Sequence, residues 1–552
     1  MMRLLKWLSP AARHSVGWLA ASVLGGAAVL LPLLYVLIAL LRPLPERWES
    51  VRNYLLTDYI AGTVQLVALT TLPAVLLGVG VAWLTSAYAF PLARLFRWAL
   101  VLPLAIPPYI GAFTYSTMTS YTGFIRAGLR NHLGIQLPPG LIDVMSLRGA
   151  AFTLTLFLFP YVFLLTKAFL QRQSAAYIEN ARLLGHSGWR LLARTVLPLG
   201  RPAIAAGGML VVFEVLSDYG VASFFGVQTL STAIFQTWFG MYDVDAAIRL
   251  AAWLLLIVVG LIVAERALRA RRRYHAASGA RPLSPMRLRG AAAWGATALC
   301  ALVLTAGFLL PFGQLVYWAA RSYAKVWRAD FGELLLNSLT GAALATLPIL
   351  ALALLIARSV RLLPGTAGAL LSRSAASGYA VPGAIVAIGV LAVCIGLDRL
   401  LAPWYARLGR GEDALVISLS LGMLLFGYMV RFLAIGYNAL ESGYTRIPHG
   451  YAEAARTLGL RPLAAFVRVE LPLLRGSLVT AAALAFIEIV KELPLTLLLR
   501  PFNFTTLATR TYQYAIDERI YEAATPAVLL IAVSLLSVLL VLRLEERKEH
   551  TK

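Results

Sequence analysis

Long apolar runs recur along the whole sequence and constrain its fold more than any other feature. A transmembrane helix needs about 20 predominantly apolar residues to cross the hydrocarbon core of a bilayer. Runs of that length occur at residues 17–41, 63–87, 97–118, 149–170, 203–225, 246–264, 292–316, 337–357, 376–397, 415–437, 476–498 and 525–543. Because 60% of the 552 residues are hydrophobic, a soluble multidomain protein is excluded. The sequence predicts an all-α polytopic membrane protein with about twelve transmembrane helices.

The second part of the sequence repeats the first. Residues 177–198 match residues 451–472 at an offset of 274. The flanking matches are 71–73 with 346–348, 105–107 with 380–382, 214–220 with 488–494, and 229–232 with 506–509. An even number of predicted spans precedes the second copy, so both copies have the same orientation. We predict two tandem six-helix halves at 1–265 and 291–552, joined by a basic cytoplasmic linker at 266–290.

The distribution of basic residues indicates the orientation. If the N-terminus is cytoplasmic, the inside segments hold 30 of the 49 Lys and Arg, and the outside loops hold 15. This asymmetry follows the positive-inside rule and predicts that both termini are cytoplasmic. The linker 266–290 has eight arginines, and we interpret it as a flexible tether and orientation signal, with contact to anionic lipid as the alternative. The net charge of +23 lies on no soluble basic domain, so no nucleic acid is expected as a partner.

The sequence lacks the motifs of an enzyme. It contains no G-x-x-x-x-G-K-[ST] phosphate loop, so ATP would have to bind to a partner subunit. The six histidines are scattered, and the two cysteines, Cys300 and Cys394, lie in apolar runs. We therefore predict neither a disulfide framework nor a metal site. We expect a transport subunit with no catalytic residue and no cofactor of its own.

The repeated segments 177–198 and 451–472 are predicted to form two short helices around a glycine. Gly185 and Gly459 suit the left-handed conformation that ends a helix. Ser187 is expected to cap the second helix in copy one and Pro462 to begin it in copy two, and Pro198 and Pro472 are expected to end the unit. The predicted apolar face consists of Ala181, Leu184 and Trp189 in copy one, and of Ala455, Leu458 and Leu463 in copy two. A partner surface or the membrane surface must cover this face.

The spacing within these segments resembles the EAA loop of ATP-binding-cassette importer permeases. That pattern has Glu-x-Ala, a Gly six residues after the Glu, and Leu-Pro at eighteen and nineteen. Copy two has the intact triplet 453–455, whereas copy one has Asn180 at the middle position. The resemblance implies coupling helices that dock on a cytoplasmic ATPase, through Glu179, Ala181, Gly185, Glu453, Ala454, Ala455 and Gly459. The alternative is a surface-lying amphipathic connector in which Glu179 and Glu453 only favour a helix N-terminus.

The same resemblance implies the rest of the assembly. Each half would have the type I importer permease fold. The partners would be two copies of the ATPase subunit, which bind the ATP, together with an extracytoplasmic substrate-binding protein and membrane lipid. The location would be the bacterial cytoplasmic (inner) membrane.

Four acidic residues occupy equivalent places in the fifth predicted span of each half. They are Glu214 and Asp218, and Glu488 and Glu492. The members of each pair are four residues apart, so they share one helical face. A carboxylate at membrane depth costs about 2.5 kcal/mol or more unless it faces protein or water. Gly220 and Pro494 interrupt the two helices at equivalent points, which is typical of a transport pathway. We predict that the four acids line the translocation pathway.

A structural ion pair is the alternative role for these acids. Lys491 could pair with Glu488 or Glu492. The first half has Ser217 at the position of Lys491, so pairing of this kind cannot account for all four acids.

The segments around the acids are similar to ferric-iron importer permeases. The similarity covers 214–220, 225–227 and 236–240 in the first half, and 491–501 and 506–509 in the second. It implies a permease for ferric iron, and hard cations prefer oxygen ligands such as carboxylates. Thiamine and related permeases of the same fused type are also similar, so thiamine or another small solute is an alternative. An ion-coupled secondary transporter can also have two six-span halves, but the motif G-x-x-x-D-R-x-G-R-R is absent from residues 86–97.

Overall fold

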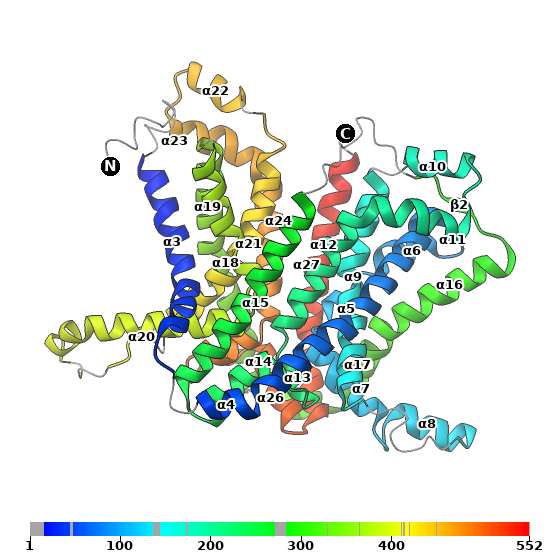
Figure 1. Cartoon of the computed structure of the whole chain (residues 1–552), viewed down its shortest axis with the longest axis horizontal. Coiled ribbons are helices and arrows are strands. Elements are labelled where there is room, and N and C mark those ends of the chain that lie inside the picture. Colours follow the sequence, from blue (N-terminus) through cyan, green and yellow to red (C-terminus); the bar gives the residue numbers. More distant parts are fainter. Residues whose placement is uncertain are drawn as a thin grey trace. The chain divides into compact units, whose positions relative to one another are not determined.

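The computed structural model describes residues 16–44, 48–135, 144–172, 175–270, 283–327, 329–363, 365–409, 411, 414–418, 420–448 and 450–550. Its residues group into two compact units (Figure 1). Unit 1 comprises Met1–Leu44, Trp327–Arg510 and Ala532–Lys552, and unit 2 comprises Pro45–Val326 and Thr511–Ile531. Each unit is a bundle of helices.

The elements of unit 1 are α3 (Val16–Ile38), η1 (Ala39–Leu41), α18 (Ala329–Leu362), α19 (Thr366–Ala376), η6 (Gly378–Ala380), α20 (Gly383–Arg407), α21 (Leu421–Tyr444), α22 (Gly450–Thr457), α23 (Pro462–Ala465), η7 (Phe466–Glu470), α24 (Leu471–Lys491) and α25 (Pro494–Leu499). The last two helices, α26 (Leu507–Ile516) and α27 (Ile520–His550), contribute residues to both units.

The elements of unit 2 are α4 (Trp48–Tyr54), α5 (Leu56–Ala87), β1 (Tyr88–Ala89), α6 (Ala93–Ala99), η2 (Leu102–Ala105), α7 (Pro108–Thr119), α8 (Phe124–Leu133), α9 (Leu147–Arg172), α10 (Ala175–Leu183), α11 (Gly188–Leu191), η3 (Leu192–Val196), α12 (Leu197–Ser217), α13 (Gly220–Phe224), α14 (Leu230–Phe235), η4 (Gln236–Gly240), α15 (Val244–Ala270), β2 (Met286–Arg287), α16 (Gly290–Leu304), η5 (Thr305–Leu309) and α17 (Leu310–Val326).

The predicted all-helical membrane fold is confirmed. Within the described residues, eleven helices are long and apolar enough to cross a membrane, or twelve if one bent pair of helices counts as a span. The bent pair is Ala93–Ala105 with Pro108–Leu133, and its two parts meet at 91°. The sequence predicted a span at 97–118, and the bend falls inside it, after Ala105.

Proline interrupts the helix in the third predicted span of each half. Ile106 precedes Pro107 and has an extended backbone, with φ −95° and ψ 113°. Val381 precedes Pro382 and has φ −87° and ψ 126°. A proline disfavours the helical conformation of the residue before it, so the helix ends there in both halves. The predicted span 376–397 is accordingly divided between α19, η6 and α20.

The first span of each half packs in the unit built mainly from the other half. In unit 1, α3 packs against α18, α19 and α20, and Figure 1 shows α3 beside α19. The hydroxyls of Ser22 and Ser359 lie 2.6 Å apart, and Trp18 Nε1 donates to Leu355 O at 3.2 Å. In unit 2, α16 and η5 pack near α6, η2 and α9. The compact units therefore exchange spans between the two repeats of the sequence.

The repeated threonines at 229–232 and 506–509 cap equivalent helices. Thr229 and Thr232 form a reciprocal capping box at the start of α14. In the second copy, the N–H of Thr509 donates to Thr506 Oγ1 at 3.3 Å, and the N–H of Thr506 donates to Thr509 Oγ1 at 3.0 Å. Each bond satisfies an amide that the helix leaves without a partner. This reciprocity explains why the repeat keeps a threonine at both ends of the motif.

Candidate docking helices and intramembrane acids

The first candidate docking segment folds around Gly185 as predicted. α10 ends just before this glycine, which has a φ of +85°. The N–H of Gly185 donates to Arg182 O at 3.0 Å, and the N–H of His186 donates to Ala181 O at 3.0 Å. These two bonds form a Schellman motif, which satisfies carbonyls at the end of a helix. The backbone therefore requires glycine at this position.

The second segment repeats this geometry. Gly459 has a φ of +87°, its N–H donates to Arg456 O at 3.0 Å, and the N–H of Leu460 donates to Ala455 O at 3.1 Å. Pro462 lies in the first turn of α23 as predicted. The predicted cap of copy one is wrong in one respect, because the side chain of Ser187 makes no capping hydrogen bond.

Pro198 and Pro472 do not end the docking segments, contrary to the prediction. The π-helical turns η3 and η7 connect α11 and α23 directly to α12 and α24. Each proline lies in the first turn of the following helix. The wider π turn shifts the hydrogen-bond ladder just before the proline, which has no N–H to donate. The second helix of each docking segment is therefore the first part of the fifth span.

Large apolar side chains face outward from both docking segments. Leu184 is 82% exposed, Trp189 is 72% exposed and Leu458 is 84% exposed. Leu463, Glu179, Glu453 and Ala454 are also exposed. Ala455 is buried and Ala181 is half-buried. The prediction that these alanines share an exposed apolar face with the leucines was therefore wrong. Each alanine lies on the inner side of its helix, Ala181 in unit 2 and Ala455 in unit 1.

An apolar cluster supports the docking segment of copy one. Ile178 and Leu191 are buried with Trp83, Leu170 and Leu283. Arg182 Nη1 donates to Ser284 O at 3.4 Å, and β2 pairs in parallel with β1. Figure 1 shows β2 next to α10 and α11. The end of the predicted flexible linker is therefore docked against this segment, while residues 271–282 lie outside the described residues.

An arginine supports the docking segment of copy two. The guanidinium of Arg358 contacts the rings of both Trp18 and Phe466, at 4.5 Å and 4.4 Å from their centroids. Its Nη2 donates to Pro462 O at 2.8 Å. Trp83 is the counterpart of Arg358 in the first half, at the offset of 275 residues shown by the flanking repeats. The two copies thus have similar backbones but different supports, one apolar and one cationic.

The acids of the second half are paired with basic side chains. Glu488 Oε1 accepts a hydrogen bond from Lys491 Nζ at 2.7 Å. Glu492 is buried, and its Oε2 lies 3.5 Å from Arg431 Nε. The predicted alternative of an ion pair with Lys491 is confirmed for Glu488, but the cation at Glu492 is Arg431. Sequence reasoning missed Arg431, although a lone arginine in the apolar run 415–437 was the available signal.

The acid at the helix break also caps the short helix that follows it. Glu492 Oε1 accepts the N–H of Leu495 at 3.0 Å. In the first half, Asp218 Oδ2 accepts the N–H groups of Val221 and Ala222 at 3.1 Å and 3.0 Å. The predicted interruptions at Gly220 and Pro494 are confirmed, since α13 and α25 begin at these residues. A carboxylate that accepts backbone N–H groups at a helix start stabilises the break.

The first half differs at the position of the buried cation. Phe157 lies there instead of Arg431, at the same offset of 274 residues. No salt bridge to Asp218 occurs among the residues that the structure describes, and Glu214 is half-buried. The structure therefore places the two acids at the helix breaks in different environments, because Glu492 lies beside a buried arginine and Asp218 does not.

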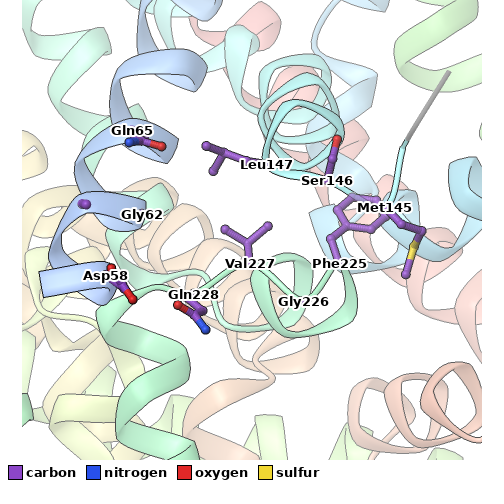
Figure 2. A pocket seen from close by; sticks show the side chains of 11 residues that line it. Asp58, Gly62, Gln65, Met145, Ser146, Leu147, Phe225, Gly226, Val227 and Gln228 are labelled. Atoms are coloured by element: carbon purple, nitrogen blue, oxygen red, sulfur yellow. The ribbon is translucent and has the colours of Figure 1, made fainter. Parts of the chain in front are cut away.

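A cavity of about 400 Å³ lies in unit 2 where α5, the start of α9 and the segment after α13 meet (Figure 2). Its polar lining comes from Asp58, Gln65, Ser146 and Gln228. The backbone of α5 at Gly62 lies directly against the carbonyl of Gln228, so a side chain at Gly62 would clash with this oxygen. Figure 1 shows the start of α5 at the end of unit 2 opposite to α10. The volume is in the range of small-molecule sites.

Comparison with known proteins gives matches over both halves. The family model "Binding-protein-dependent transport system inner membrane component" matches residues 74–270 and 349–550. The Fe(3+)-transport system permease protein FbpB 2 of Haemophilus influenzae is 25% identical over 92% of this chain and 94% of its own length. "Probable ABC transporter permease protein y4fN" of Sinorhizobium fredii is 23% identical over 90% of this chain and 89% of its own. "Probable sulfate transport system permease protein cysT" of Chlorokybus atmophyticus is 30% identical, but over 26% of this chain and 48% of its own.

Proposed function

Because this chain belongs to the family of binding-protein-dependent transport system inner membrane components, we propose that it is the permease through which an ATP-driven importer carries ferric iron. Its membership of that family makes it a multi-pass inner-membrane permease of an ABC importer, with an ATPase and a substrate-binding protein as partners. The predicted fused arrangement of two permease halves is confirmed by the two matched segments.

One observation carries the proposal of iron as the substrate. The relative named for Fe(3+) transport is similar over 92% of this chain, whereas two relatives named for sulfate transport are similar over 26% and 42% of it. Carboxylates at the helix breaks are also the kind of ligand that a hard cation prefers. Thiamine or another small solute remains the second candidate, as the sequence resemblance implies. Relatives named for sulfate and 2-aminoethylphosphonate transport also match parts of this chain.

Other parts of the proposal concern the assembly. We infer that both termini are cytoplasmic, that two ATPase copies bind ATP, and that this chain has no cofactor or catalytic site of its own. The exposed leucines beside Gly185 and Gly459 support a docking role for the two segments, because an apolar surface of this kind requires a partner. Glu179 and Glu453 are exposed on the same helices and would contact the ATPase.

Uptake assays test the substrate. Cells that lack other iron importers and express this permease with its partners should accumulate radiolabelled ferric iron in an ATP-dependent manner. Labelled thiamine should not accumulate above the level of cells without the permease. Accumulation of thiamine without iron would reject ferric iron and support the second candidate.

Variants at the docking glycines test the coupling role. Replacing Gly459 by Pro removes a backbone N–H that donates to Arg456 O and imposes a φ near −65° where the backbone needs +87°. Transport should fall to background while the protein still inserts, and Glu453→Lys should also uncouple transport from ATP hydrolysis. Gly450→Ala is the matched control, because a Cβ there would meet no atom within 4 Å. Unchanged uptake in a Gly185→Pro, Gly459→Pro double variant would reject the docking role.

A further inference from the structure

A cluster of tyrosines lies at the helix breaks of unit 2. The ring of Tyr512 is 6.0 Å from the ring of Tyr109 and 5.9 Å from that of Tyr219, measured between centroids. Tyr109 is the second residue of α7, directly after the bend of the third span, and Tyr219 lies in the break of the fifth span. Tyr219 also stacks on Phe235 at 3.7 Å. The breaks of two spans therefore position the rings of Tyr109 and Tyr219 next to the ring of Tyr512.

The hydroxyl of Tyr512 lacks a well-aligned partner. Tyr512 is only 4% exposed, and its hydroxyl makes no hydrogen bond of good geometry to the part of the chain that the structure describes. Tyr219 and Ser223 lie close enough for weak side-chain hydrogen bonds to it, and the Asp218 carboxylate interacts with it electrostatically. A buried hydroxyl whose hydrogen bonds are poorly aligned keeps part of its desolvation cost uncompensated. Such a group points to a ligand that is bound only at times.

Asp218 can still accept further contacts in this cluster. Its oxygens accept two backbone N–H groups, but an ionised carboxylate offers about four lone-pair sites. No cation of the described residues forms a salt bridge with it. A carboxylate and nearby phenol groups together supply hard oxygen ligands, which suit a hard cation.

The repeat does not produce a second copy of this cluster. By the offsets of the flanking repeats, the sequence counterparts of Tyr109, Tyr219 and Tyr512 are Ala384, Leu493 and Phe235, none of which has a hydroxyl. Its acid, Glu492, is neutralised by Arg431. The tyrosine hydroxyls are thus concentrated in unit 2, and packing of the repeat does not require them.

We propose that Tyr219, Tyr512 and Asp218, with Tyr109 beside them, form a transient site for the ferric ion, an inference that rests on the proposed function. The ion would exchange its carrier ligands for the phenolate and carboxylate oxygens. Binding requires deprotonated phenols, so the phenol protons are released to water when the ion arrives. Both the third and the fifth span are interrupted at these residues, and interrupted spans are typical of transport pathways.

Absorption spectroscopy tests the site directly. The full chain in lipid nanodiscs would be titrated with ferric nitrilotriacetate, because coordination of Fe(III) by phenolate produces a visible charge-transfer band. Tyr512→Phe keeps the ring and should weaken iron binding at least about tenfold. Tyr428→Phe is the matched control, because Tyr428 is also buried and its hydroxyl already pairs with Thr496 at 2.7 Å. Its band should equal that of the unchanged protein.

The outcomes separate the site from the proposed function. A band of equal strength in Tyr512→Phe, or no band in the unchanged protein, would overturn the site. If cells still import iron in that case, the proposed function stands without it. A band that disappears in Tyr512→Phe, together with at least about tenfold lower iron uptake and a normal protein level in the membrane, supports the site.

Discussion

At the scale of single residues, Arg431 determines how the second half tolerates a buried carboxylate. Its guanidinium lies 3.5 Å from Glu492, and both side chains are largely buried. Removing one member of a buried ion pair costs about 3–5 kcal/mol, because the other charge stays buried without compensation. We therefore expect Arg431→Met to reduce the thermal stability of the purified protein strongly, and Arg431→Met with Glu492→Gln to recover most of the loss.

Lys491→Met is the matched control for this prediction. Its partner Glu488 is more exposed than Glu492, so the same change should cost less than about 1 kcal/mol. A greater loss of stability in Lys491→Met than in Arg431→Met, measured by the same thermal melt, would contradict the assignment of partners. Sequence spacing indicated Lys491 as the partner because it is adjacent to Glu492 in the chain. Arg431 comes from another helix, and only the packing of α21 brings it to Glu492.

At the scale of elements, the two docking segments differ in what holds them. The linker end contributes Leu283 to the apolar cluster under α10, with Ile178 and Leu191. Leu283→Ala should loosen α10 and raise the hydrogen exchange of its amides, since burial of a leucine contributes about 2–5 kcal/mol. Exchange in α22 should not change. Met286→Ala is the control, because this neighbouring side chain is exposed.

An unchanged hydrogen-exchange rate in α10 of the Leu283→Ala variant would show that the linker end does not stabilise the docking segment. The sequence predicted both docking segments, because glycine at a left-handed position and its spacing to other residues are local features. It did not predict the docked linker end or the π turns. Both depend on packing between segments that are distant in the chain, such as β1 and β2.

At the scale of the whole molecule, the repeat and the span count followed from the sequence, whereas the exchange of first spans did not. Hydropathy identifies each span but carries no information on which half it packs against. The contacts of α3 with α18 and α20 come from small and hydroxyl side chains such as Ser22 and Ser359. These residues are common in membrane helices, so their pairing could not be derived from one sequence.

The orientation of the chain is testable by labelling. Single cysteines would replace Met286 and Tyr121, two exposed residues on opposite sides of the predicted bilayer. An impermeant thiol reagent added to intact spheroplasts should label the cysteine at 121 and leave that at 286 unlabelled, because the basic linker side is cytoplasmic. The native Cys300 and Cys394 are buried and give a low background. Labelling at 286 from outside would reverse the predicted orientation.

Native mass spectrometry of the complex isolated from membranes tests the central claim most directly. If both docking segments bind an ATPase, the complex contains one permease chain and two ATPase subunits. The Gly459→Pro variant should lose one of these subunits, and the double variant with Gly185→Pro should lose both. An isolated chain without ATPase subunits, or a double variant that still carries two, would contradict the account.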